Sequence, residues 1–351
     1  MLLEDTLKRI QPLDRSLEIE ARRRLDSLTK PQGSLGKLEE LACRVAVIQK
    51  KVPPQIGKKL LFVFAGDHGI TEEGVSAYGK EVTAQMTHNF LRGGAAINVL
   101  ARHYNVEVEV IDVGVDYEFT GPPGLGNYKV RRGTANFARG PAMTRAEARQ
   151  SIETGIRLVE KVASKELFLL GAGEMGIGNT SSAAAILCAL TGGAPRDLVG
   201  RGTGIDDTTW RRKVAAVERG LEINRPDPRD PLDILSKVGG LEIGAMTGMM
   251  LGAAAFRIPM ILDGFISGAA ALLAQGLCPN VHEVFFASHR STETGHGVLL
   301  EALKLLPVLE LEMRLGEGTG ACILMGLIEA TVKILGEMAT FESAGVGKKL
   351  P

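Results

Sequence analysis

The sequence carries no excess of charge of either sign. Its 351 residues include 41 lysines plus arginines and 41 aspartates plus glutamates, so the formal net charge is zero. Such a balance gives no long-range attraction to the phosphate backbone of a nucleic acid or to an anionic bilayer. The composition therefore argues against nucleic-acid and membrane partners.

Cysteine is scarce, and its residues are scattered. The four cysteines show no CxxC pairing and stand far apart, at Cys43, Cys188, Cys278 and Cys322. A disulfide framework or a zinc site would show closer and more regular spacing. The six histidines likewise form no HExxH or other metal-ligand pattern. We therefore expect reduced thiols in the core and no metal ion.

The sequence also lacks an uninterrupted apolar run long enough to span a membrane. The apolar tract 243–277 is broken by Arg257, Pro259 and Asp263, and a spanning helix needs about 20 apolar residues. We interpret this tract as a buried helix, a strand and another buried helix. A signal peptide is not expected because charged residues occupy the start, at Glu4, Asp5, Lys8 and Arg9. These features predict a soluble, cytoplasmic protein without membrane insertion.

Short apolar runs that alternate with helical stretches are the main feature that is present. These runs lack polar alternation, and they cover 60–65, 106–113, 166–170, 259–262 and 283–287. Strands of this kind, separated by helices, are typical of a parallel sheet with helices on both faces. Most of the runs end in a loop with polar groups, and ligands of such sheets bind outside the carboxyl ends of the strands. The fold class predicted is α/β.

Glycine is abundant, with 43 residues, whereas aromatic residues make up only 5%. The densest cluster places glycines at 171, 173, 176 and 178 between an apolar run and a helix that begins near Asn179. Backbone N–H groups and the positive end of a helix dipole favour an anion at such a position. The spacing also matches the dinucleotide fingerprint, with Asp197 about 20 residues further on. Phosphate binding is the favoured interpretation, and a tight turn without a ligand is the alternative.

Two further glycine clusters leave alternatives open. The first, at 200–204, precedes Asp206, Asp207 and a helix with Arg211, Arg212 and Lys213. It is either a phosphate cradle or a capped helix whose basic residues face water. The second, at 314–320, holds Glu317 between two glycines. This glutamate is either a catalytic group close to a ligand or an acid that complements the dipole of the following helix.

Two histidines lie in loops at the ends of predicted strands. His68 stands in 66–69 and His289 in 288–291, so either can contact a substrate or form structural hydrogen bonds. A Gly-x-Ser-x-Gly elbow and a Walker lysine motif are both missing from the sequence, which argues against a serine hydrolase and a P-loop NTPase.

Several segments together resemble the nicotinate-nucleotide–dimethylbenzimidazole phosphoribosyltransferase family. The segments occur in one order along the chain, at 30–36, 65–69, 74–78 with 82–86, 173–180, 262–265, 288–289 and 315–320. They span almost the whole chain, so the resemblance is much more specific than any one motif.

The resemblance implies a reaction and an architecture. Members of the family transfer phosphoribose from nicotinate mononucleotide to 5,6-dimethylbenzimidazole, which yields α-ribazole 5′-phosphate for the lower ligand of cobalamin, and nicotinate. It also implies a homodimer that uses no metal and no cofactor. The implied fold is a large domain, 55–304, with a parallel sheet in Rossmann-like order. Residues 1–54 together with 305–351 are expected to form a small helical domain.

The resemblance also assigns roles to individual residues. Glu317 matches the catalytic glutamate, expected to act as a general base on the benzimidazole N–H. The residues expected to bind phosphate or ribose are Glu174, Gly176, Ile177, Gly178, Asn179, Thr180, Gly202, Gly204, Lys213 and Asp263. Those expected to bind the base are Ser76, Tyr78, Gln85, Met175 and Leu315.

Two other functions compete with this one. An NAD-linked oxidoreductase would use the fingerprint at 171–176, and a non-enzymatic nucleotide-binding module would keep the phosphate cradle alone. The second alternative does not require the carboxylate of Glu317. The identity of the acceptor base stays open, because the stretch 78–80 lies where members of the family are expected to vary.

Overall fold

The described residues form one six-stranded, fully parallel sheet. A computed structural model describes residues 2–163, 166–202 and 204–347 of the chain. The strand order is β3-β2-β1-β4-β5-β6. The strands are β1 (Lys58–Gly66), β2 (Glu107–Gly114), β3 (Leu125–Asn127), β4 (Leu167–Met175), β5 (Met260–Leu262) and β6 (Phe285–Ala287).

This strand order is that of a Rossmann-like, doubly wound sheet. Five of the strands coincide with the apolar runs of the sequence, so the predicted α/β class is confirmed. Leu60 to Gly66 are all buried, which explains why this run shows no polar alternation. No apolar run marks β3, because this strand has only three residues and none of them is fully buried.

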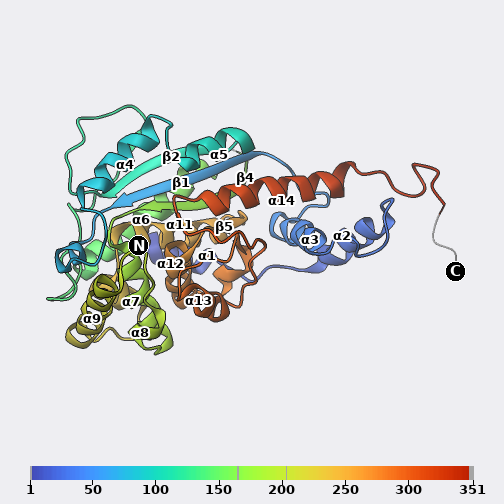
Figure 1. The fold of residues 1–351 in the computed structure, drawn as a ribbon. Coiled ribbons are helices and arrows are strands. Elements are labelled where there is room, and N and C mark those ends of the chain that lie inside the picture. The colour runs from blue at the N-terminus through green and yellow to red at the C-terminus, as the bar shows by residue number, and fades with distance from the viewer. Residues whose placement is uncertain (1, 164–165, 203, 348–351) are drawn as a thin grey trace.

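Helices cover both faces of the sheet (Figure 1). α4, α5 and α14 lie on one side of the central strands, and α6, α11 and α12 lie on the other. The helices are α1 (Leu2–Arg9), α2 (Ser16–Ser27), α3 (Lys37–Gln49), α4 (Glu81–Leu91), α5 (Ala96–Tyr104), α6 (Arg145–Val162), α7 (Asn179–Thr191), α8 (Pro195–Leu198), α9 (Asp207–Asn224), α10 (Pro231–Val238), α11 (Leu241–Ala255), α12 (Phe265–Leu277), α13 (His296–Leu303) and α14 (Thr319–Glu337), with 3₁₀ helices η1 (Gly69–Glu73) and η2 (Pro279–Val284).

The apolar tract 243–277 forms α11, β5 and α12, as predicted, and it lies in the core. In the described part of the chain, α14 is the one helix both long and apolar enough to span a membrane. It packs against β4, β5, α3 and α5, so it is a core helix in this fold. The four cysteines are buried free thiols, as expected.

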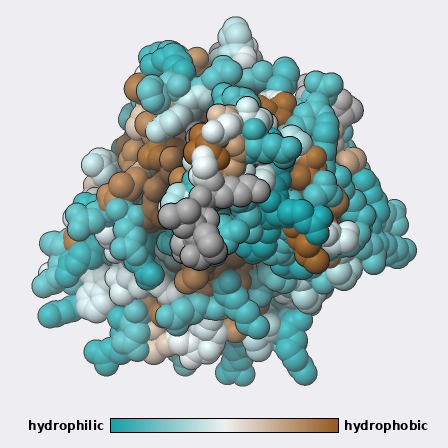
Figure 2. All heavy atoms as spheres, turned by 90° about the vertical axis from the view of Figure 1, so that its right-hand side faces the viewer, coloured by the Kyte–Doolittle hydropathy of each residue, from teal (hydrophilic) through white to brown (hydrophobic). Residues whose placement is uncertain are grey.

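The two ends of the chain meet in a second, smaller core. Ala21, Leu25 and Leu28 of the N-terminal region pack with Cys43 and Leu335, and the cluster also includes Ala42 and Ala46. Figure 1 shows α2 and α3 beside the C-terminal half of α14, away from the sheet. Figure 2 views this end directly: hydrophilic side chains cover most of it, and apolar side chains show in separate patches. By contrast, α1 packs against α6 and α11, so the division into two domains stays a prediction.

Candidate active site

A cavity of about 660 Å³ opens at the carboxyl ends of the central strands. Its walls come from the loop after β4, the loop after β5, the loop after β6 and the turn before α14. Strand order reverses between β1 and β4, and ligands of doubly wound sheets bind at such a switch point. The cavity is therefore where the fold itself predicts a ligand.

The loop after β4 forms one wall of the cavity. Gly178 is the N-cap of α7 and has a φ of 97°, a left-handed conformation that favours glycine. Gly176, Ile177, Asn179 and Thr180 line the cavity, so the start of α7 faces it. Gly178 itself is not among the lining residues. The positive end of the α7 dipole is thus available to an anion in the cavity.

The first two glycines of the fingerprint do not belong to this loop. Residues 171–175 continue β4, whereas the sequence had indicated that the loop begins at Gly171. Gly173 makes room for the turn before α14, because a Cβ there would lie 2.8 Å from the carbonyl carbon of Glu317. Its role is close packing of backbone, and this corrects the interpretation of 171–176 as one glycine loop.

Lys213 reaches the start of α7 from α9. Its side chain is buried, and its Nζ donates hydrogen bonds to Thr180 Oγ1 at 2.8 Å and to the Gly200 carbonyl at 3.2 Å. Burial lowers the pKa of Lys213 to about 8. An anion in the cavity beside Thr180 would stabilise the charged ammonium. Gly202 also lines the cavity, whereas Gly204 lines a neighbouring one.

The turn before α14 holds three consecutive residues in the left-handed region. Gly316, Glu317 and Gly318 have φ values of 85°, 62° and 89°. Such a conformation is uncommon for a residue with a side chain, and strain of this kind clusters at functional sites. The turn fixes the direction in which the Glu317 side chain leaves the backbone, and Glu317 lines the cavity.

Asp263, which follows β5, holds the other end of this turn. Its carboxylate accepts hydrogen bonds from the backbone N–H groups of Gly318 at 3.2 Å, Gly320 at 2.7 Å and Ala321 at 3.1 Å. Asp263 therefore occupies the N-terminal amides of α14. Burial raises its pKa to about 7, although these three hydrogen bonds oppose the shift.

The Glu317 carboxylate lies at the start of another helix. Its Oε2 accepts a hydrogen bond from the Ile97 N–H, in the first turn of α5, at 3.3 Å. The side chain is buried, and burial raises the pKa of Glu317. From the sequence, Glu317 was a candidate acid to complement the dipole of α14. In the structure its carboxylate lies at the N-terminus of α5 instead, so it interacts with the α5 dipole. A carboxylate with a raised pKa is a stronger base than an exposed one.

Glu174, at the end of β4, is a second carboxylate in the cavity. Its Oε2 accepts a hydrogen bond from Asn179 Nδ2. Burial, together with the charges of Asp263 and Glu242, raises the pKa of Glu174 to about 8. This environment favours the protonated form of Glu174 when the cavity holds no ligand. A cationic ring bound beside it would favour its ionised form.

Of the five residues predicted to contact a base, three line the cavity and two do not. Tyr78, Met175 and Leu315 line the cavity, and Tyr78 and Leu315 keep half or more of their surface exposed. Ser76 lies in the turn before Tyr78 and accepts a hydrogen bond from its N–H, and Gln85 lies on the exposed face of α4. Neither of these two is among the cavity-lining residues.

Several lining residues were not predicted. They lie in α4, in the loop after β5 and the first turn of α12, in the loop after β6 or in the turn before α14, and they are Val82, Met86, Gly264, Phe265, Ile266, Ser267, Ser291, Glu293, Arg314 and Gly316. The rule that ligands bind at strand ends pointed to the loops after β5 and β6, although not to their individual side chains.

The two histidines have different surroundings. His289 lines the cavity, shares a hydrogen bond with Ser288 Oγ at 2.9 Å, and has its pKa lowered by burial. His68 is buried outside the cavity wall, between Glu242 Oε1 at 2.5 Å and Ser182 Oγ at 3.0 Å. The structure thus gives His68 the structural role and places His289 where it can contact a ligand.

Comparison with known proteins assigns the family. Residues 10–346 match a family described as phosphoribosyltransferase. The chain is 56% identical over 345 residues to the nicotinate-nucleotide–dimethylbenzimidazole phosphoribosyltransferase of Geobacter sp. (strain M21), covering 98% of this chain and 99% of that relative. The chain belongs to this family.

Other members of the nicotinate-nucleotide–dimethylbenzimidazole phosphoribosyltransferase family are similar to this chain over almost their whole length. The protein of this name from Geotalea uraniireducens (strain Rf4) is 55% identical over 347 residues, 99% of each chain. A crystal structure of the Thermus thermophilus protein has a TM-score of 0.90 and 46% identity, and the match covers 96% of this chain and 100% of that one. The chain is therefore an enzyme, a phosphoribosyltransferase of cobalamin lower-ligand synthesis. The expected Rossmann-like sheet is confirmed.

Proposed function

We propose that the enzyme transfers phosphoribose from nicotinate mononucleotide to 5,6-dimethylbenzimidazole, or to a related base. The products are α-ribazole 5′-phosphate and nicotinate, and the anomeric carbon is inverted. We further infer that it works in the cytoplasm as a homodimer. The names of its relatives support the substrates. The observation that carries the proposal is the buried Glu317 carboxylate in the wall of the same cavity that the start of α7 faces.

Glu317 is the general base in this proposal. One ring nitrogen of the neutral benzimidazole attacks C1′ of the ribose with its lone pair, while the other ring nitrogen loses its proton to the Glu317 carboxylate. The C1′–N bond to nicotinate breaks, and its electron pair leaves with the pyridine nitrogen, which becomes neutral. Proton removal by a positioned base contributes roughly 10²–10⁴-fold. The raised pKa of Glu317 supports this role, because it brings the base closer to neutral pH.

The 5′-phosphate lies at the start of α7. The positive end of the α7 dipole provides a site for an anion, while the Ile177 N–H donates to Thr83 Oγ1 at 3.2 Å and holds the loop in place. Lys213 supports this placement through Thr180. Gly178, Gly202 and Gly204 remain proposed contacts to phosphate or ribose, as the resemblance implies; of these, Gly202 lines the cavity, and Gly204 lines the neighbouring one. Glu174 and Asp263 border the ribose, since both line the cavity between α7 and α14.

The acceptor base occupies the apolar side of the cavity. Met175 and Leu315 line that side together with Val82 and Met86 of α4. Ser76 and Gln85 remain proposed contacts to the edge of the base, near Tyr78. The alternative of an NAD-linked oxidoreductase is weakened, because the first two fingerprint glycines lie within β4.

Nicotinate release tests this function. The purified protein is mixed with nicotinate mononucleotide and a panel of dimethylbenzimidazole, benzimidazole, a phenol and adenine, and released nicotinate is quantified. We expect base-dependent release, fastest with a benzimidazole. A protein that binds the mononucleotide but releases no nicotinate with any base would contradict the proposal.

A further inference from the structure

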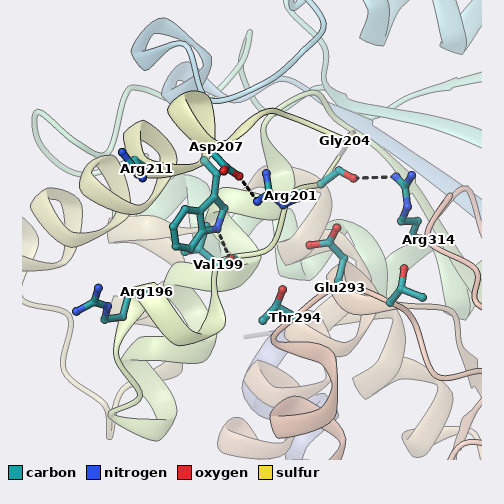
Figure 3. A pocket seen from close by; sticks show the side chains of 12 residues that line it. Arg196, Val199, Arg201, Gly204, Asp207, Arg211, Glu293, Thr294 and Arg314 are labelled. Atoms are coloured by element: carbon teal, nitrogen blue, oxygen red, sulfur yellow. Dashed lines mark hydrogen bonds and ion pairs between the residues drawn. The ribbon is translucent and has the colours of Figure 1, made fainter.

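A second cavity, of about 560 Å³, lies beside the active-site cavity (Figure 3). Its walls come from α8, α9, the loop between them and residues 292–294. The two cavities share Gly202, Glu293 and Arg314. We call this second cavity the arginine pocket, after its lining residues Arg196, Arg201, Arg211 and Arg314, which stand with Asp207 and Trp210.

The arginine pocket has a surplus of positive charge. Its lining includes four arginines and two carboxylates, Asp207 and Glu293, which leaves a formal charge of two positive units (4 − 2). Arg201 is paired with Asp207, and Arg314 donates to the Gly202 carbonyl at 3.3 Å. Arg196 and Arg211 form no ion pair within the described ranges. A phosphomonoester carries about −1.5 to −2 charges at neutral pH, so it matches this surplus.

Trp210 adds a flat apolar surface to the pocket. Its Nε1 donates a hydrogen bond to the Val199 carbonyl at 2.8 Å, which fixes the half-buried indole in the wall. Aromatic side chains bind bases by stacking. The pocket thus offers a surface for a planar ring beside a site for a phosphate.

Glu293 lies on the opposite side of the pocket. It is buried in the pocket wall, its Oε2 packs against Gly200 without a hydrogen-bond partner, and its charge acts on the Lys213 ammonium. As a carboxylate that lines the pocket, Glu293 can accept a hydrogen bond from a hydroxyl group there. Phosphate, hydroxyl and planar ring are the three groups of a mononucleotide, and the pocket volume falls within the roughly 300–1,000 Å³ usual for small-molecule sites.

We propose that the arginine pocket is a second mononucleotide site. Its arginines bind the phosphate, Glu293 accepts a ribose hydroxyl, and the base lies against Trp210. The shared wall makes it a holding site next to the active-site cavity, so that one chain binds two mononucleotides at once. The choice of ligand rests on the proposed function. The test therefore measures binding alone, without an acceptor base.

Trp210 provides a local signal, because it is the one tryptophan of the chain. The full-length protein is titrated with nicotinate mononucleotide, and Trp210 fluorescence is recorded along with the stoichiometry by calorimetry. We expect a saturable fluorescence change and two mononucleotides per chain. In the double variant Arg196→Gln/Arg211→Gln we expect one mononucleotide per chain. The concentration of mononucleotide that gives half of the Trp210 fluorescence change should rise at least about 10-fold.

Arg212→Gln is the matched control, since Arg212 is also on α9 but donates to the Gly74 carbonyl outside the pocket. We expect it to behave as the unchanged protein. Titrations with inorganic phosphate and ribose 5-phosphate separate the contributions of phosphate, sugar and base, and both should bind more weakly than the mononucleotide. One mononucleotide per unchanged chain, an unaltered response in the double variant, or equal binding of inorganic phosphate would overturn the proposal.

Discussion

Two helices of this enzyme begin in the same way and serve different purposes. α7 follows the turn Gly176-Ile177-Gly178, and α14 follows the turn Gly316-Glu317-Gly318. In both, the N-cap is a left-handed glycine, with φ of 97° and 89°, and the helix after it is apolar and buried. Both helix starts line the active-site cavity or border it.

The two helices differ in the groups that accept hydrogen bonds from their first backbone N–H groups. Asp263 takes three N–H groups at the start of α14. Over the part of the chain that the structure describes, no carboxylate accepts from a backbone N–H in the first turn of α7; Glu174 accepts only from the Asn179 side chain, and Lys213 lies behind Thr180. An anion is therefore repelled from α14 and attracted to α7. In the proposed mechanism, one helix start binds the substrate phosphate and the other positions Glu317.

Among the variants that test this difference between α7 and α14, we expect Asp263→Asn to lower turnover and stability the most. An asparagine presents one acceptor and an NH₂ group, so one amide of α14 loses its acceptor and the Glu317 turn shifts. Measured above the pKa of Asp263, turnover should fall about 10–100-fold and the free energy of unfolding by about 1–3 kcal/mol. Steady-state kinetics and chemical denaturation measure the two effects.

Asp230→Asn is the control for this variant. Asp230 caps α10 through the N–H groups of Leu232 and Asp233, outside the cavity. We expect a loss of about 0.5–2 kcal/mol of stability and unchanged turnover. If Asp263→Asn also left turnover unchanged, Asp263 would have no part in positioning Glu317.

A smaller effect is expected at the start of α7, from Lys213→Met. The methionine fills the buried position but cannot donate to Thr180 or attract an anion. We expect KM for nicotinate mononucleotide to rise about 10-fold, with a smaller change in kcat. Lys237→Met, on α10, removes the same charge outside the cavity and should leave KM unchanged. A lower kcat at unchanged KM in Lys213→Met would place the phosphate elsewhere.

Sequence patterns predicted the sheet well, because its strands are buried on both faces. They also predicted which loops form the ligand site, since the carboxyl ends of parallel strands lie at one edge of the sheet. The division of labour between α7 and α14 was not predictable in this way. It depends on Asp263 reaching Gly318 and on Glu317 reaching Ile97, contacts between residues 55 and 220 positions apart.

The resemblance led to the same active-site loops, but not to what each residue contacts. Asp263 lines the cavity where it was predicted to bind phosphate or ribose, but the resemblance did not indicate the hydrogen bonds that its carboxylate accepts from backbone N–H groups. The arginine pocket was missed because Arg196 and Arg314 come from separate segments, and no local spacing indicates that they share a cavity.

The central claim is that Glu317 removes the proton from the incoming base, and kcat of Glu317→Gln tests it most directly. Nicotinate release is measured across pH with saturating substrates, beside Glu301→Gln, a control on the exposed face of α13. We predict that Glu317→Gln binds nicotinate mononucleotide normally but loses roughly 10²–10⁴-fold in kcat. Because burial raises the pKa of Glu317, the unchanged enzyme should lose activity as pH falls through that pKa. Full turnover in Glu317→Gln would contradict the account.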